Sequence, residues 1–169
     1  MKHLLTLNLE DSTKEEVATY AIRRAARAVV FDADGKVALL HATKNGYYKL
    51  PGGGIEGGEA PVDALVRECR EEIGCEIEVL SELGEIIEYK KKDNLKQISY
   101  AYVARVVGEK GTPHLETGEE AEGFQTAWFP FEEAQKVITE CPRVFYPAEY
   151  MVARDARFLD EAKEEAESM

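Results

Sequence analysis

Residues 51–75 read PGGGIEGGEAPVDALVRECREEIGC, a glycine-rich loop that runs into a segment with helical periodicity. Pro61 suits the first turn of a helix, where its missing N–H costs nothing, and Gly74 suits the left-handed conformation that ends one. A helix is therefore expected over residues 61–73. The loop before it lets a ligand approach the backbone closely, yet its charged side chains are glutamates, which would repel a bare phosphate.

The expected helix has an apolar side and an acidic side. Its apolar residues share one stripe that should face a core: Val62, Leu65, Val66, Cys69 and Ile73. Its carboxylates gather on the opposite side: Glu68, Glu71 and Glu72. Like charges at this spacing destabilise an isolated helix by roughly a few tenths of a kcal/mol per pair, so something is expected to neutralise them.

Two explanations of the acidic side remain open at this point. A solvated acidic face is the simpler one. The other is a metal site, because hard divalent cations take oxygen ligands, and Mg²⁺ in particular is held by a few carboxylates, waters and substrate phosphates. The loop favours the metal site, since it brings backbone carbonyls and an open approach to the same carboxylates. Phosphate would then arrive as a ligand of the metal.

Two other glycine-rich motifs fit less well. Gly52, Gly54 and Gly57 satisfy the dinucleotide pattern GxGxxG, but that pattern needs a helix that opens at its last glycine and faces a pyrophosphate. Here Pro61 starts the helix later, and the glutamates of the loop would repel the pyrophosphate. A P-loop needs Gly-Lys-Ser or Gly-Lys-Thr, and neither triplet occurs in the chain.

Residues 53–75 resemble the signature of the Nudix hydrolases. The match covers each of its fixed positions: Gly53, Glu59, Arg67, Glu68, Glu71, Glu72 and Gly74. Cys69 and Cys75 stand where the signature has bulky apolar residues, which leaves the charged set intact. A looser resemblance extends along about residues 25–140. It implies an α/β fold, the α/β/α sandwich with a mixed sheet, and an enzyme that hydrolyses a nucleoside diphosphate linked to another moiety.

Carried over by position, the resemblance implies a metal site whose ligands are Glu68, Glu71, Glu72 and the backbone carbonyl of Gly52. Mg²⁺ is the expected ion, with Mn²⁺ as the alternative. Glu59 and Arg67 match positions that support and orient the ligands, and Arg67 lies within helical pairing reach of Glu71. The expected catalytic residues of the signature are therefore Glu59, Arg67, Glu68 and Glu71.

Many members of that family place a further catalytic glutamate in a loop before a late strand, as a base or an extra ligand. The segment TGEEAEGFQTAWF offers Glu119, Glu120 and Glu122. Glu122 is favoured for its spacing to Trp128 and for the Gly123 that follows it. An ordinary loop carboxylate is the alternative for each of the three.

Candidate contacts to substrate phosphates lie in and before the loop. Arg23, Arg24 and Arg27 enter an expected strand, and arginine forks suit phosphate, although a solvated basic patch explains them nearly as well. The backbone at Gly53 is expected to lie against the substrate, because a side chain there would obstruct its approach.

Candidate contacts to a base are aromatic. Tyr48, together with Tyr47 and Trp128, is predicted to offer a ring for stacking, and core packing is the alternative for each. His41 and His114 show no partner pattern and are interpreted as structural.

The substrate itself is predicted by exclusion. The ADP-ribose type of Nudix hydrolase tends to have a proline soon after the signature, whereas here the next proline is Pro113. Marks of the coenzyme A and NADH types are not found, and Tyr89 stands slightly too early for the dinucleoside polyphosphate type. A nucleoside triphosphate pyrophosphatase remains. The alternatives are an ADP-ribose or dinucleoside polyphosphate hydrolase and a catalytically silent nucleotide-sensing domain.

Composition limits partners and location. The formal net charge of −12 argues against a long nucleic acid as partner, because binding one depends on Lys and Arg. A small phosphorylated nucleotide remains a possible partner, since a bound metal would reverse the local charge. No run of roughly 18 apolar residues and no charged-then-apolar leader is found, so neither a membrane partner nor secretion is expected. The three cysteines lack zinc-type spacing, which predicts reduced thiols in the cytoplasm. A homodimer remains open.

At 169 residues the chain is expected to form a single domain, with residues 1–20 as an N-terminal extension and residues 147–169 as a C-terminal helix. Thr13 and Glu16 predict a capping box at a brief helical turn. The other expected elements are strands over 3–9, 25–31, 36–42, 47–50, 76–80, 84–90, 97–107 and 126–129, and helices over 61–73, 131–138 and 147–165.

Overall fold

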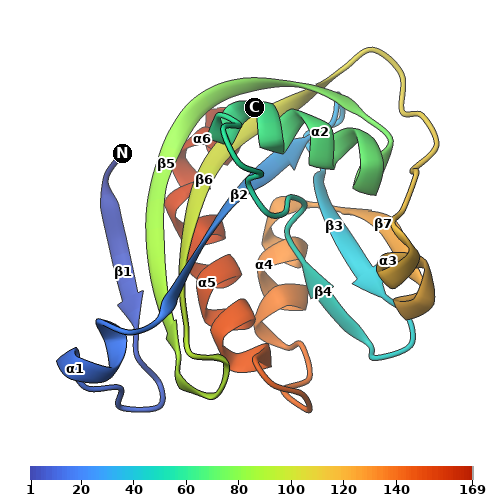
Figure 1. The fold of residues 1–169 in the computed structure, drawn as a ribbon. Coiled ribbons are helices and arrows are strands. Elements are labelled where there is room, and N and C mark those ends of the chain that lie inside the picture. Colours follow the sequence, from blue (N-terminus) through green and yellow to red (C-terminus); the bar gives the residue numbers. More distant parts are fainter. Residues whose placement is uncertain (169) are drawn as a thin grey trace.

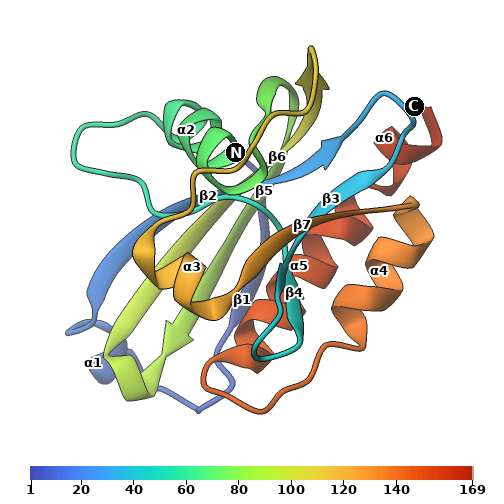
Figure 2. The ribbon, with the colours of Figure 1, turned by 90° about the vertical axis from the view of Figure 1, so that its right-hand side faces the viewer.

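The computed structural model describes residues 1–168, which form an α/β/α sandwich (Figure 1). The elements are β1 (His3–Leu7), α1 (Lys14–Val17), β2 (Ala21–Phe31), β3 (Val37–Ala42), β4 (Tyr47–Lys49), α2 (Pro61–Ile73), β5 (Glu76–Lys90), η1 (Lys91–Asp93), β6 (Leu95–Val107), α3 (Thr117–Glu122), β7 (Phe124–Phe129), α4 (Phe131–Thr139), α5 (Ala148–Glu161) and α6 (Lys163–Ser168). Figure 2 shows α2 on one side of the sheet and α4 with α5 on the other. The predicted fold class is confirmed.

The sheet has seven strands in the order β1-β5-β6-β2-β3-β4, with β7 paired to β3. It is mixed, because β2 runs parallel to β6 and β1 parallel to β5, while the other pairs are antiparallel. Alternate side chains of β2 are buried on opposite faces. Ala28 and Val30 pack with α2, whereas Val29 and Phe31 pack with α4 and α5. Strand β2 is therefore packed between α2 on one face and α4 with α5 on the other.

Residues 76–80 and 84–90, predicted as two strands, belong to the single strand β5. The pairing of β5 with β6 shows two register shifts before residue 84. Gly84 has a φ of +150°, and a Cβ there would meet the carbonyl oxygen of Lys2 at 2.6 Å. The glycine therefore marks an irregularity where β1 approaches closely, and not a turn between strands.

Helix α2 has the predicted bounds, and Gly74 ends it with a φ of +64°. Its buried side differs from the predicted stripe, since Val62 is 38% exposed and Ala64 is fully buried. Glu72 also belongs to the buried side and is only 1% exposed. The acidic side of α2 is thus turned partly into the protein, which a pattern of apolar residues does not indicate.

Two further helices differ from the prediction. The acidic segment before β7, predicted as part of a loop, forms α3. A capping box of Glu116 and Glu119 begins it, with glutamate in place of the usual Ser or Thr, and Gly123 ends it with a φ of +70°. The helix predicted over residues 147–165 is divided at Ala162 into α5 and α6. The predicted capping box at α1 is confirmed.

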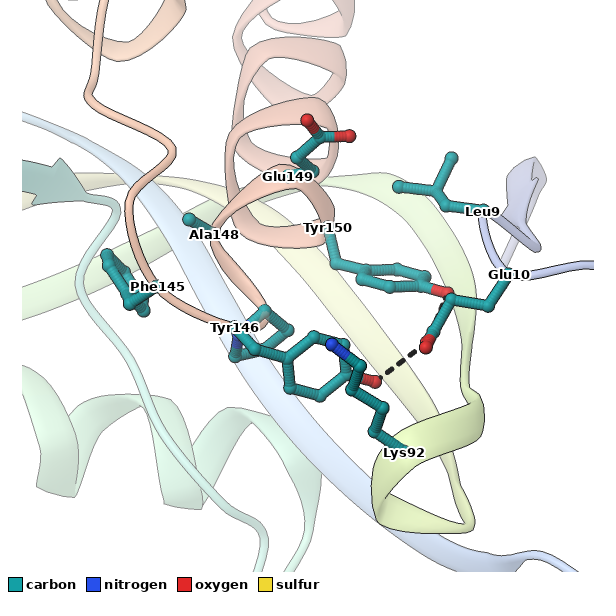
Figure 3. Close-up of a pocket in the computed structure, with 9 residues that line it drawn as sticks. Leu9, Glu10, Lys92, Phe145, Tyr146, Ala148, Glu149 and Tyr150 are labelled. Atoms are coloured by element: carbon teal, nitrogen blue, oxygen red, sulfur yellow. Dashed lines mark hydrogen bonds between the residues drawn. The ribbon is translucent and has the colours of Figure 1, made fainter.

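The N-terminal segment is tied to the start of α5. Glu10 accepts hydrogen bonds from the hydroxyls of Tyr146 at 2.8 Å and Tyr150 at 3.2 Å, and Figure 3 shows both rings pointing toward this carboxylate. The single hydroxyl hydrogen of Tyr150 is shared between Glu10 and the carbonyl of Tyr89, whose oxygen lies nearer, at 2.6 Å. A cavity of about 180 Å³ lies beside these rings, with Lys92 among its lining residues. These contacts fix the start of α5 against β5.

The three cysteines are buried and unpaired. Cys69 packs in the core beneath α2, where burial raises the pKa of its thiol well above the usual range. Its predicted place on the apolar stripe that faces a core is confirmed. Among residues 1–168, no helix is long and apolar enough to cross a membrane.

Candidate active site

The glycine loop runs beside β2 like an additional strand. Three backbone hydrogen bonds join them: Ala28 N–H to Pro51 O at 3.1 Å, Ala26 N–H to Gly53 O at 2.9 Å, and Ile55 N–H to Arg24 O at 2.9 Å. Because alternate peptide groups of a strand face opposite sides, those of Gly52 and Gly54 face away from β2 and toward α2. The N–H of Gly52 accordingly donates to Glu72 at 2.6 Å.

Two glycines of the loop have no room for a side chain. Gly52 has a φ of +121°, and a Cβ there would run into the carbonyl oxygen of Ala26. At Gly53, a Cβ would lie 2.5 Å from each carboxylate oxygen of Glu68. The backbone of the loop thus passes directly over the carboxylates of α2, which explains why glycine occupies these positions.

Glu72 is the buried centre of the site. Its carboxylate accepts the N–H of Gly52 and lies 3.2 Å from the ammonium of Lys49. Burial raises the pKa of Glu72 to about 7, while the charges of Lys49 and Arg27 oppose this effect. Lys49 was not predicted from the sequence. Its position directly before LPGGG was the available signal, but nothing in the pattern showed that it points to α2.

Arg67 connects the other acidic groups of the site. Its guanidinium binds Glu59 through two bonds, at 3.1 and 3.0 Å, and donates to Glu68 at 2.8 Å. It also donates to the carbonyl of Gly54 at 3.1 Å and makes a longer contact of 3.5 Å to Glu71. The bond from Arg67 is the main cause of a lowered pKa at Glu59. At Glu68, burial outweighs Arg67 and raises the pKa. The sequence signature thus predicted residues that lie together.

The donor set of this site fits a hard divalent cation. The carboxylates of α2 and the peptide oxygen of Gly52 are the kind of ligand that Mg²⁺ and Mn²⁺ take. Within residues 1–168, no three carboxylate, imidazole or thiol groups converge within ligating range. Glu68 and Glu71 contact Arg67 instead, so both would have to turn from Arg67 to reach a cation. Both side chains are partly buried, that of Glu68 at 14% exposed and that of Glu71 at 34% exposed.

Helix α3 places two of the late glutamates in different contacts. Glu122 accepts a hydrogen bond from the Tyr47 hydroxyl at 2.5 Å. Burial and this bond raise the pKa of Tyr47 above its usual range. Glu119 accepts the N–H of Glu116 at 3.0 Å, and its charge adds to the effect of burial on the pKa of Glu72. Glu119 therefore lies within electrostatic reach of α2, while Glu122 is held at β4.

The predicted phosphate-binding arginines lie in two environments. Arg23 and Arg24 line a pocket of about 420 Å³ together with the glycine loop. Arg27 is only 5% exposed, and its Nε and Nη1 atoms have no hydrogen-bond partner among the described residues 1–168. Burial lowers the pKa of Arg27 to about 10, with the charge of Arg154 acting in the same direction and that of Glu72 opposing it. Arg27 thus has free donors near the carboxylates of α2.

The predicted aromatic contacts are largely taken up in packing. Tyr48 stacks on His41 with ring centroids 4.2 Å apart. Tyr47 is buried, and the ammonium of Lys110 lies 3.8 Å from the centroid of the Trp128 ring. A base that stacked on Tyr48 would have to use the face turned away from His41.

Comparisons with known proteins agree with this geometry. The NUDIX domain model matches residues 21–148. Diphosphoinositol polyphosphate phosphohydrolase 2 of Mus musculus is 31% identical over 134 residues, which cover 76% of this chain and 69% of that protein. The RNA pyrophosphohydrolase of Helicobacter pylori strain P12 is 43% identical over 58 residues, 34% of this chain, and the match spans only 37% of that protein.

Among solved structures, the MutT protein from Methanosarcina mazei Go1 superimposes with a TM-score of 0.60 at 18% identity, over 91% of this chain and 99% of that one. This likeness supports the fold. The family match over residues 21–148 and the relative at 31% identity go further. The chain belongs to the NUDIX hydrolase family, as the resemblance of its signature predicted.

Proposed function

We propose that this chain is a divalent-metal-dependent hydrolase that cleaves a phosphoanhydride bond in a small phosphorylated nucleotide. The observation that carries the proposal is the position of Glu72, buried against the N–H of Gly52, at the part of the loop where a side chain on Gly52 or Gly53 would clash. Burying a carboxylate is costly unless a cation or hydrogen bonds compensate. Lys49 and the N–H of Gly52 compensate Glu72 here, and a divalent cation bound beside a phosphate would do the same.

In this proposal, the cation is held by Glu68, Glu71, Glu72 and the carbonyl of Gly52. A bound Mg²⁺ or Mn²⁺ neutralises phosphate oxygens and makes water nucleophilic at neutral pH. Glu59 and Arg67 orient the carboxylates that bind the ion, since Arg67 contacts them and the loop carbonyl of Gly54.

The remaining residues act on the substrate and the attacking water. The proposal requires Arg27 to turn outward and donate to a substrate phosphate from its Nε and Nη1, which are buried and have no hydrogen-bond partner among residues 1–168. The backbone of Gly53 would lie against the same phosphate. Glu122 accepts the proton that water loses on attack. Tyr48 contributes the free face of its ring to the bound base.

A nucleoside triphosphate, cleaved to monophosphate and pyrophosphate, is the proposed substrate. A diphosphoinositol polyphosphate is the second candidate. It is favoured by the arginines that line the pocket, Arg23 and Arg24, and by the relative of that name at 31% identity. Arginine forks suit several phosphates at once, whereas a base needs a free aromatic face.

Turnover of a substrate panel separates these candidates. With Mg²⁺ and equal concentrations, nucleoside triphosphates, including oxidised forms, are expected to be cleaved faster than ADP-ribose, a dinucleoside polyphosphate, a diphosphoinositol polyphosphate and 5′-triphosphorylated RNA. Phosphate, pyrophosphate and AMP release would be measured. Faster release of phosphate from the diphosphoinositol compound would select the second candidate. Binding of a nucleotide without turnover of any compound would indicate a sensing domain.

The late glutamates are separated by two matched variants. Glu122→Gln is expected to lower kcat by about 100-fold or more with little change in KM, because a general base acts on the chemical step. Glu119→Gln is expected to change neither. Tyr47→Phe controls for the loss of the hydrogen bond that Tyr47 gives Glu122. A large loss of kcat in Glu119→Gln alone would move the role to Glu119, whose charge reaches Glu72.

A further inference from the structure

The start of the glycine loop is held from the opposite layer by α5. Asp155, which is fully buried, accepts the backbone N–H of Leu50 at 2.9 Å. Leu50 directly precedes Pro51, which has no N–H of its own. Two residues further on, Gly52 donates to Glu72 on α2. The loop start is therefore fixed from two helices on opposite faces of the sheet.

Asp155 is itself held by charge. The Nε of Arg154 donates to its other carboxylate oxygen at 2.7 Å, and Arg154 is 3% exposed. The Nη1 of Arg154 lies 3.6 Å from Glu88, a fully buried residue of β5. A buried carboxylate paired in this way has a defined position, because moving it would break its bond with Arg154 and leave the buried N–H of Leu50 without a partner.

The same polar layer reaches the other end of the loop. Gln97 of β6 donates to Glu88 at 2.9 Å and accepts a bond from Arg23 at 2.9 Å. The guanidinium of Arg23 lies beside Gly54, where it would be 3.6 Å from an added Cβ. One connected set of polar side chains thus extends from Asp155, which holds residue 50, to the exposed Arg23 beside residue 54.

The position of α5 along its axis is fixed independently of the loop. Tyr150, slightly more than one turn before Asp155, donates to the carbonyl of Tyr89 and to Glu10 (Figure 3). The family match ends at residue 148. Asp155, which contacts the loop, and Arg154, which contacts Asp155, therefore lie beyond the matched region. Neither is part of the signature.

We propose that Asp155 is a positioning residue for the reaction: by holding the N–H of Leu50 it keeps the peptide group of Gly52 against Glu72, and Arg154 keeps Asp155 in place. The expected effect on catalysis rests on the proposed function. The anchoring of the loop by Asp155 does not depend on that function. A shift of about 1 Å at a reacting group can cost about 100-fold in rate, so a distant anchor can matter.

The test compares Asp155→Ala with Asp155→Asn and with Phe158→Leu, a core substitution on the next turn of α5. In Asp155→Ala the amide hydrogens of Leu50 and Gly52 should exchange at least about 10-fold faster. Its kcat should fall about 10- to 100-fold, the Mg²⁺ concentration for half-maximal rate should rise, and KM should change little. Asp155→Asn keeps an acceptor for Leu50 and should recover most of each loss.

Phe158→Leu should lower the thermal midpoint without changing exchange at Leu50, kcat or the Mg²⁺ requirement. The proposal is overturned if Asp155→Ala leaves exchange at Leu50 and Gly52 unchanged, or if Phe158→Leu reproduces its losses. If Asp155→Ala does not fold, Asp155→Ser replaces it with the same expectations, because its side chain is too short to reach Leu50. If the wild-type chain cleaves no phosphoanhydride, the proposed function is refuted. Hydrogen exchange at Leu50 and Gly52 in Asp155→Ala would still show whether Asp155 anchors the loop.

Discussion

Replacing Glu72 or Glu71 with Gln is expected to lower kcat/KM by more than about 100-fold while the fold persists. Each substitution keeps the shape of the side chain and removes the charge that a cation needs. Loss of groups that only support metal ligands already costs about 10- to 100-fold, and loss of a ligand should cost at least as much. The fold should tolerate Glu72→Gln, because burial already raises the pKa of Glu72 to about 7 and an amide oxygen can still accept the N–H of Gly52.

The measurement is a Mg²⁺ titration of the hydrolysis rate for each variant, with the thermal midpoint as a check on folding. Glu133→Gln, on the exposed side of α4, removes one negative charge away from the site and should behave like the wild type. Activity near the wild-type level in both Glu71→Gln and Glu72→Gln, at every Mg²⁺ concentration, would refute the assignment of the metal site.

Gly53→Ala is expected to lower kcat by about 10- to 100-fold with little change in thermal midpoint. The added Cβ would lie 2.5 Å from both carboxylate oxygens of Glu68, so this carboxylate must move. Moving the end of a flexible side chain costs the fold little, but it displaces a proposed metal ligand. The φ of Gly53 is not positive, so the requirement at this position is space and not an unusual backbone conformation.

Two other glycines of the loop serve as controls. Gly57→Ala should keep full activity, since a Cβ there has no atom within 4 Å. Gly52→Ala should lower the thermal midpoint as well as activity, because Gly52 has a φ of +121° and its Cβ would meet the backbone of Ala26. Equal kcat in Gly53→Ala and Gly57→Ala would show that the close approach to Glu68 is not needed.

Local signals predicted the part of the site that is contiguous in sequence. Pro61 and Gly74 set the bounds of α2, and helical spacing placed Arg67 beside Glu71, because these effects act within a few residues. The same locality explains an error. Val62 fits the apolar stripe of the helix but is exposed, because the spacing of residues within a helix does not show what lies beneath each of them.

Contacts between distant segments could not be predicted in this way. Lys49 and Glu72 pair across 23 positions, and Asp155 reaches Leu50 across 105. The periodicity of the sequence does not predict such contacts, because they depend on how the helical layers and the sheet stack. The start of α3 was missed for a different reason, since a glutamate does the work of the usual Ser or Thr in its capping box.

The first strand, β1, lies at the edge of the sheet and outside the family match. It pairs with residues 85–88 of β5 and buries Leu7 against the core. An uncovered strand edge presents free N–H and C=O groups to which another chain can add. A chain shortened to begin at β2 would uncover this part of β5 and the apolar surface beside it. Residues 3–7 therefore cover this stretch of β5, and the short strand β1, with 5 residues, takes its place at the edge of the sheet.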